Sequence, residues 1–207
     1  MLAIFKREFK SYFQNVIGWL FVAALLAVYG LYFYVYNLKN GYPYISYDLN
    51  GIGFIMMIAV PILTMRSLSD EKKTKTDQLM LTSPVSVGRI VAGKYFAMAA
   101  VYTIVIALFA LSPLVLSIYG KVALSEAYVA LFGYWLYGLS CIAVGLFISS
   151  ISESVIISAI LTFTALFLSY MMQSITGLIS SSGNLLTKVL NCFDLYTPFE
   201  NFVSGCF

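Results

Sequence analysis

The chain alternates between long apolar runs and short polar segments. Five runs have the length and composition of bilayer-crossing helices, which need about 17–25 mostly apolar residues. We place these crossings at 16–38, 52–68, 95–119, 128–151 and 155–175. A turn is expected before the second run, at Pro43, Asp48 and Asn50–Gly51. The second run is the shortest and contains Pro61, and we expect its helix to continue into the polar segment after it.

The first residues of the chain have an amphipathic pattern. With helical periodicity, apolar side chains share one face, and basic and hydroxyl side chains occupy the rest. The apolar positions are Leu2, Phe5, Phe9, Tyr12 and Phe13, and the polar ones are Lys6, Arg7, Lys10 and Ser11. Residues 1–14 are therefore predicted to form an interfacial helix. A cleaved signal peptide is the alternative, but the following apolar run is too long and shows no small-residue cleavage site.

Charged residues concentrate in one segment, 66–94. It contains six of the 12 basic residues and three of the nine acidic ones. These are Arg66, Lys72, Lys73, Lys75, Arg89 and Lys94, with Asp70, Glu71 and Asp77. Basic residues next to membrane spans stay on the cytoplasmic side, so this segment and the N-terminus are predicted to be cytoplasmic. Lys39, Lys121 and Lys188 then lie outside, and after the fifth crossing residues 177–207 form an extracytoplasmic segment.

The composition agrees with a membrane protein. Because 61% of the residues are hydrophobic and 10% are charged, the chain has too little polar surface for a water-soluble fold. We predict an all-α integral membrane protein, a polytopic helix bundle with an N-terminal interfacial helix and five transmembrane helices. The net charge of +3 is confined to loops and suggests no nucleic-acid partner. The chain has no histidine, which removes the usual general base, and we expect no catalytic residue, metal or cofactor.

The three cysteines show no paired spacing typical of a metal site. Cys141 lies in an apolar run, on one helical face with Gly138 and Gly145, where small side chains favour close packing of helices. Cys192 and Cys206 are both expected on the oxidising side of the membrane. There they could form a disulfide or remain free thiols.

The charged segment also contains helix signals. Ser67 and Asp70 have the S-x-x-D spacing of a capping box, which predicts a helix over 69–81, and Ser152 is predicted to cap the fifth crossing in the same way. The predicted helix 69–81 ends in three adjacent apolar residues, Leu79, Met80 and Leu81. An apolar tip rimmed by charge is typical of a partner site. A solvated loop whose tip touches the lipid surface is the alternative, and composition leaves both open.

One nucleotide-binding pattern within the segment is rejected. Residues 88–94 match G-x-x-x-x-G-K, the loop that cradles phosphates in ATPases. Tyr95 follows where a serine or threonine should hold magnesium, and a turn rather than a buried strand precedes the match. We interpret the match as chance, so the chain is not expected to hydrolyse ATP itself.

Several stretches resemble one family of membrane proteins. Residues 70–86 resemble a pattern of an acid-and-basic pair, Gly-Thr, an acid, two or three leucines and T-S-P-V-S, and Gly93–Lys94, 145–150 and 197–202 add further matches. In these stretches the chain resembles ABC-2 type permeases, the membrane subunits of ATP-binding-cassette exporters, and especially the gliding-motility (GldF-like) group. Lys75 stands where the family usually has glycine. The family has six crossings, so we expect this chain to be truncated or a fragment.

The resemblance implies a division of labour between subunits. Residues 1–207 would form one ABC-2 type transmembrane domain in the bacterial cytoplasmic membrane, paired with a second permease subunit that is identical or different. A separate ABC ATPase would dock on the helix at 69–81, here called the coupling helix, and drive export. The docking residues would be Asp70, Glu71, Lys72, Lys73, Asp77, Leu79, Met80 and Leu81. The chain would then act with an ATPase, a second permease and lipid.

Two other functions compete with this interpretation. A secondary transporter or channel working alone needs an ionisable residue or a strongly polar helix face within the membrane. The candidates for such a face are the serine and threonine residues at 158–164, which are common in membrane helices. A membrane-embedded enzyme is ranked lowest, because no cluster of catalytic residue types lies near one membrane face.

Overall fold

The structure is a computed structural model that describes residues 2–42, 44–75, 86–119, 123–179 and 194–204. All regular structure within these ranges is helical. Five of the described helical stretches are long and apolar enough to cross a membrane. The prediction of an all-α membrane protein with an N-terminal helix is therefore confirmed.

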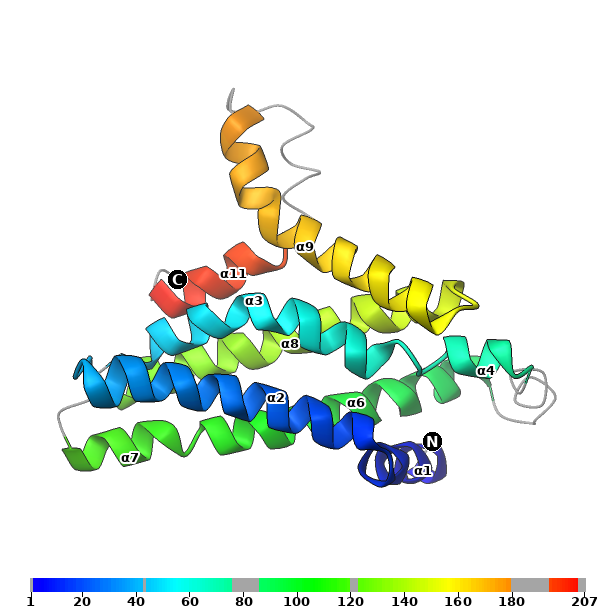
Figure 1. Cartoon of the computed structure of the whole chain (residues 1–207), viewed down its shortest axis with the longest axis horizontal. Coiled ribbons are helices and arrows are strands. Elements are labelled where there is room, and N and C mark those ends of the chain that lie inside the picture. Colours follow the sequence, from blue (N-terminus) through cyan, green and yellow to red (C-terminus); the bar gives the residue numbers. More distant parts are fainter. Residues whose placement is uncertain (1, 43, 76–85, 120–122, 180–193, 205–207) are drawn as a thin grey trace.

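The long helices run along the bundle in alternating directions (Figure 1). Their bounds are α1, Leu2–Gln14; α2, Val16–Phe33, continued by the π-helix η1, Tyr34–Lys39; α3, Ile45–Thr64; α4, Ser69–Lys73; α6, Val87–Phe109; α7, Ser112–Tyr119; α8, Leu124–Ile151; α9, Val155–Ile179; and α11, Tyr196–Ser204. Figure 1 shows α1 and α4 at one end of the bundle and α7 at the other. The two segments predicted to be cytoplasmic thus lie at the same end.

Helix α3 lies at the centre of the bundle, where it contacts α2, α8 and α9. Its side chains Leu49, Ile52, Met56 and Val60 are fully buried. Lipid is as apolar as these side chains, so packing of complementary surfaces rather than a hydrophobic driving force holds such helices together. Large apolar side chains elsewhere remain exposed, as expected for surfaces that face lipid.

Small residues let α8 approach its neighbours closely, as predicted. A Cβ atom on Gly138 would lie 2.3 Å from the ring of Tyr102 on α6, and one on Gly145 would lie 2.5 Å from Oγ1 of Thr64 on α3. Cys141, on the same face, is buried and free. The three residues therefore form the surface on which α6 and α3 pack.

The predicted turn before the second crossing is wrong for the described residues 48–51, because α3 already begins at Ile45. The side chain of Asn37 donates a hydrogen bond to the buried carboxylate of Asp48. The Asn50 side chain accepts one, of 3.1 Å, from the hydroxyl of Tyr196. Tertiary partners thus bind side chains that would otherwise favour a turn, although Oδ1 of Asp48 and Oδ1 of Asn37 have no hydrogen-bond partner in the described structure.

Other helix ends also differ from the predictions. Helix α6 begins at Val87 rather than near residue 95, and the third crossing breaks after Phe109 before continuing as α7. Pro113 lies in the first turn of α7, where its missing N–H is tolerated. Helix α8 begins at Leu124, before the predicted start of this crossing at residue 128, and so includes Glu126. Ser152 does not cap α9, since its hydroxyl is buried without a hydrogen-bond partner in the described structure.

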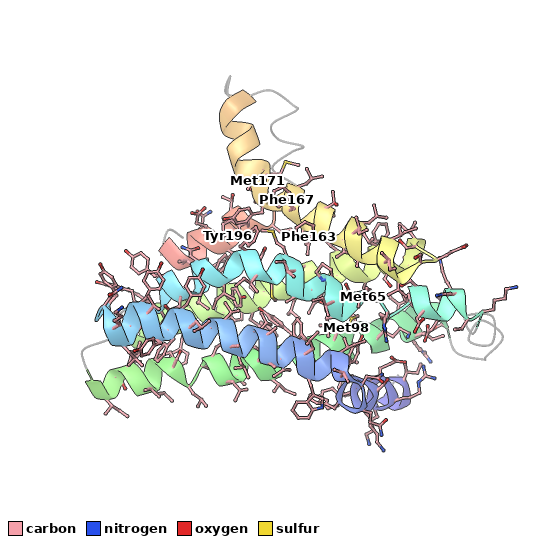
Figure 2. All side chains as sticks on the ribbon, in the orientation of Figure 1. Met65, Met98, Phe163, Phe167, Met171 and Tyr196 are labelled. Carbon is pink, nitrogen blue, oxygen red and sulfur yellow. The ribbon has the colours of Figure 1, made fainter. Side chains whose placement is uncertain are left out.

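The last part of the chain returns to the bundle. Helix α9 extends to Ile179, past the predicted start of the polar segment at residue 177, and α11 packs on α8, α3 and α9. Tyr196 lies where α11 meets α9, with its ring centroid 4.6 Å from that of Tyr170 (Figure 2). The ring of Phe199 lies 5.5 Å from both Tyr134 and Tyr137 of α8. Cys192 and Cys206 lie outside the described residues.

Candidate docking site beside the N-terminal helix

The charged segment leaves the end of α3 as a short turn followed by α4. Helix α3 ends at Thr64, so the predicted continuation of this helix through the charged segment is wrong. Helix α4 ends at Lys73, short of the predicted residue 81, and Lys75 has a φ of 56°. This left-handed conformation ends a helix and favours glycine. Lys75 therefore has a backbone conformation that favours glycine, the residue that the resembled family usually has at this position.

The cap of α4 comes from α8 and not, as predicted, from Ser67 directly before the helix. The Ser67 hydroxyl is buried beside the hydroxyl of Tyr12 and does not cap α4. Instead, the backbone N–H groups of Leu68 and Ser69 each donate to Oγ of Ser149 on α8, at 3.2 Å. A side-chain oxygen that accepts such N–H groups has the role of an N-cap. Helix α4 is thus attached to the end of α8 by a residue 80 positions away.

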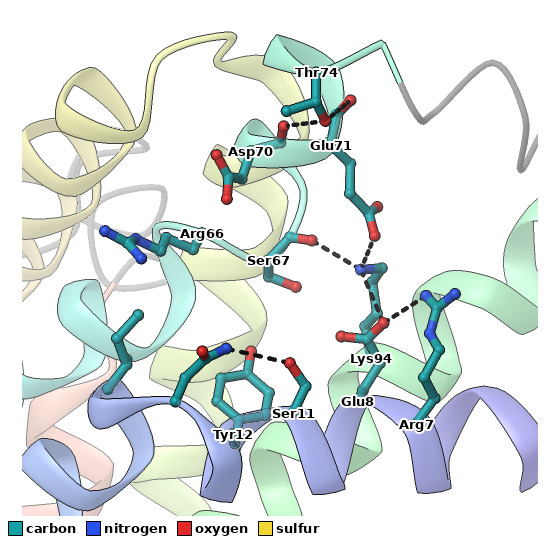
Figure 3. Close-up of a pocket in the computed structure, with 12 residues that line it drawn as sticks. Arg7, Glu8, Ser11, Tyr12, Arg66, Ser67, Asp70, Glu71, Thr74 and Lys94 are labelled. Carbon is teal, nitrogen blue, oxygen red and sulfur yellow. Dashed lines mark hydrogen bonds and ion pairs between the residues drawn. The ribbon is translucent and has the colours of Figure 1, made fainter.

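Lys94 is the most unusual side chain at this end of the bundle. It lies on α6, and its side chain is only 2% exposed. Its ammonium group lies 2.6 Å from the carboxylate of Glu71 on α4 and 3.5 Å from that of Glu8 on α1, and it donates to the carbonyl of Ser67 at 2.9 Å (Figure 3). A buried charge is tolerated only when it is paired and hydrogen-bonded. Lys94 therefore ties α1, the turn after α3 and α4 to α6.

A third contact joins α4 to α8. The ammonium group of Lys72 donates a hydrogen bond to the backbone carbonyl of Ser150. With the Ser149 cap and the Lys94 ion pair, α4 is held on two long helices at once. Helix α4 is therefore in contact with both α6 and α8 through polar side chains.

These contacts border a cavity of about 370 Å³ between α1 and α4. The start of α2, the turn after α3 and Lys94 of α6 complete its walls. The lining residues are Arg7, Glu8, Ser11, Tyr12, Asn15, Ile17, Arg66, Ser67, Asp70, Glu71, Thr74 and Lys94. Burial, together with the nearby carboxylate of Glu8, raises the pKa of the Tyr12 hydroxyl, so this group remains a neutral hydroxyl.

The predicted docking residues divide into three groups. Glu71 and Lys72 contact the bundle, whereas Asp70 and Lys73 have exposed side chains. The remaining four, Asp77, Leu79, Met80 and Leu81, lie outside the described residues. Half of the predicted site is therefore placed on α4, and its apolar tip stays a prediction.

Sequence reasoning missed the partners of this segment. Lys94 was counted as the last charge of a loop, although it shares a helical face with Ile90, Ala97 and Met98, all of which are buried. That spacing was the available signal. Glu8 was not singled out, since the amphipathic pattern of α1 concerned its basic and apolar residues, and nothing in the local sequence connects Ser149 with α4.

The phosphate-loop match at 88–94 lies entirely within α6. Lys94 is buried against carboxylates and cannot reach a nucleotide phosphate from this position. The interpretation of the match as chance is confirmed.

Comparison with known proteins identifies the family. A family model described as ABC-2 family transporter protein matches residues 31–204, from the end of α2 to α11. No curated protein and no solved structure matches the chain. The matched region includes α4 and the Lys94 and Ser149 contacts that hold it, together with four of the five long apolar helices. The chain therefore belongs to the ABC-2 family of transporter proteins.

Proposed function

We propose that this chain is the permease subunit of an ATP-driven exporter of the GldF-like group, with a separate ATPase docked on α4 and the segment that follows. The observation that carries the proposal is the attachment of α4 to α6 and α8 through Lys94, Lys72 and Ser149. A docking element must pass force to the membrane helices. An element fixed by buried polar contacts can do so, whereas a loose solvated loop cannot.

The surface of α4 supports recognition of a soluble partner. Asp70 and Lys73 expose opposite charges, and the sequence predicts an apolar tip at 79–81. A charged rim around an apolar centre is the usual composition of a protein–protein interface. The ATPase would recognise this surface, and the bundle would respond through the contacts of Glu71 and Lys72.

The arrangement in the membrane follows from the same proposal. The end of the bundle that carries α1 and α4 would face the cytoplasm of a bacterial cell, because basic residues concentrate there. A second permease subunit, identical or different, would pair with this one. ATP hydrolysis would occur in the ATPase, and its closure would drive a change in the packing of α6 and α8.

The structure contains one observation that favours a transporter working alone. Asp48 is completely buried in α3, and buried ionisable residues in membrane helices commonly serve ion coupling. However, Asp48 is the fourth residue of a 20-residue helix, about 5 Å from its start. It is also hydrogen-bonded to Asn37, so its position near the helix end fits a structural pairing better than an ion pathway at mid-membrane.

The docking proposal can be tested with a double variant, Leu79→Asp with Leu81→Asp. We expect it to lose co-purification with the proposed ATPase partner, because two carboxylates would replace the apolar tip. Leu124→Asp is the matched control, since Leu124 is an exposed leucine at the start of α8, at the other end of the bundle. Undiminished association of the double variant would refute the docking claim. Transport in liposomes without any ATPase would favour the secondary transporter instead.

A further inference from the structure

We propose that the cavity between α1 and α4 binds the headgroup of a zwitterionic phospholipid that carries a primary ammonium group, such as phosphatidylethanolamine. The inference concerns lipid binding by the permease alone. It does not depend on the docking of an ATPase.

The cavity lies at the level where lipid headgroups are expected. Its walls include Asn15 and Ile17, at the start of α2, and Arg66 and Ser67, directly after the end of α3. Both α2 and α3 are long enough to cross the membrane. The ends of membrane-crossing helices mark the boundary between the hydrocarbon core and the headgroup region.

The indole of Trp19 supports the same level. Trp19 is 60% exposed, and its Nε1–H donates a 2.9 Å hydrogen bond to the carbonyl of Phe13 in α1. Tryptophan side chains are enriched at the boundary between lipid and water. A lipid that lies against α1 and α2 can therefore bring its headgroup to the mouth of the cavity.

Two charged side chains in the cavity wall have no ion-pair partner in the described structure. Arg66 carries a guanidinium group and Asp70 a carboxylate, and both side chains are exposed to the cavity and its surroundings (Figure 3). A guanidinium group binds the oxygens of a phosphate in a fork-like geometry. A carboxylate accepts hydrogen bonds from an ammonium group. Together they match the two charges of an ethanolamine phosphate.

Two hydroxyl groups lie together in the wall of the cavity. Ser67 is only 7% exposed, and its side chain interacts with the hydroxyl of Tyr12. Figure 3 shows Ser67, in the turn after α3, above Tyr12 of α1. A hydroxyl group that accepts one hydrogen bond can donate another. A phosphate oxygen in the cavity can therefore accept a hydrogen bond from this pair.

The charge of the cavity decides between classes of lipid. Its lining contains three cationic residues, Arg7, Arg66 and Lys94, and three anionic residues, Glu8, Asp70 and Glu71. An anionic headgroup would gain from Arg66 but would be repelled by Asp70, whereas a zwitterionic headgroup pairs with both. The ammonium hydrogens of ethanolamine can be donated to Asp70, and the methylated ammonium of choline has none to donate.

The volume of the cavity is suitable for a phospholipid headgroup. At about 370 Å³ it is at the small end of ligand pockets, which span roughly 300–1,000 Å³. It can enclose a headgroup while the acyl chains remain outside, beside the apolar side chains of α1 and α2.

The test uses the purified permease, without ATPase, in nanodiscs of phosphatidylcholine that contain equal small fractions of phosphatidylethanolamine and phosphatidylglycerol. Lipids that remain bound after release into mild detergent are counted by native mass spectrometry. We expect phosphatidylethanolamine to be retained about tenfold over the other two, the factor that one charge-assisted hydrogen bond supplies.

Two variants separate the parts of the proposed site. Asp70→Asn should remove the preference for phosphatidylethanolamine over phosphatidylcholine, and Arg66→Gln should lower retention of both. Glu153→Gln is the control, since Glu153 is an exposed carboxylate in the turn between α8 and α9 and should change neither. All three replaced side chains are exposed, and gel filtration checks that each variant is folded.

Three results would overturn the proposal. The first is equal retention of the three lipids by the unmodified permease. The second is a preference for phosphatidylglycerol, which would indicate a simple basic surface. The third is an unchanged preference in Asp70→Asn.

Discussion

The Lys94 ion pair gives the most direct test of how α4 is held. Replacing Lys94 with methionine keeps an apolar stem of similar length but removes the ammonium group. The carboxylates of Glu71 and Glu8 then lose their common partner, and the carbonyl of Ser67 loses a donor. We expect Lys94→Met to destabilise the bundle and to loosen α4 in particular.

The size of the effect follows from the contacts. Lys94 makes two hydrogen bonds, at 2.6 and 2.9 Å, and a hydrogen bond to a charged group contributes about 1.5–3 kcal/mol. Two effects reduce the loss. The variant no longer buries a charge, and the side chains of Glu71 and Glu8 are 20% and 15% exposed, so water screens them in part. We expect a net loss of about 2–3 kcal/mol, or roughly 4–12 °C in melting temperature for a chain of this size.

Thermal unfolding of the detergent-purified permease measures this loss. Lys73→Met is the matched control, because Lys73 is an exposed lysine of α4 with no ion-pair partner in the described structure. A cycle with Glu71→Gln should give a coupling free energy of at least about 1 kcal/mol with Lys94→Met. Equal melting temperatures for Lys94→Met and Lys73→Met would refute the reasoning. They would mean that the buried ammonium group contributes nothing to the attachment of α4.

Two further changes test other contacts. Ser149→Ala removes the acceptor for the N–H groups of Leu68 and Ser69, so we expect a loss of about 1 kcal/mol in stability and faster hydrogen exchange at these two amides. The control is Ser140→Ala, which loses only a hydrogen bond to its own helix. Equal exchange at the two amides in both variants would contradict the cap. Gly138→Ala places a Cβ atom 2.3 Å from the Tyr102 ring, and we expect it to cost about 1–3 kcal/mol in thermal unfolding. Gly30→Ala, where the added atom meets nothing within 4 Å, should be neutral or slightly stabilising, and the same result for Gly138→Ala would show that the two helices are not tightly packed.

The sequence predicts the membrane class because long apolar runs leave few alternatives. The presence of five crossings, the amphipathic helix at the N-terminus and the close packing around Gly138 all follow from composition and helical spacing. Helix ends were harder to place. Polar residues near the ends, such as Asp48 and Lys94, suggest loops when read alone, but partners distant in the sequence allow both to lie inside helices.

The candidate site also depends on contacts between distant residues that the sequence does not reveal. The charged residues of α4 were identified from their concentration between two apolar runs. Their division into exposed and buried groups was not, because it depends on Glu8, Lys94 and Ser149, which come from three other helices. The left-handed backbone at Lys75 likewise ends α4 earlier than the local pattern of charges predicts.

The attachment of α4 also limits how this surface can diverge among related transporters. Glu71 and Lys72 contact the permease itself, so a substitution at either position would destabilise the fold as well as alter the binding of an ATPase. Lys73 has an exposed side chain and makes no such contact in the described structure. When one ATPase replaces another during evolution, we therefore expect substitutions at Lys73 and in the residues after α4, while Glu71 and Lys72 stay constant.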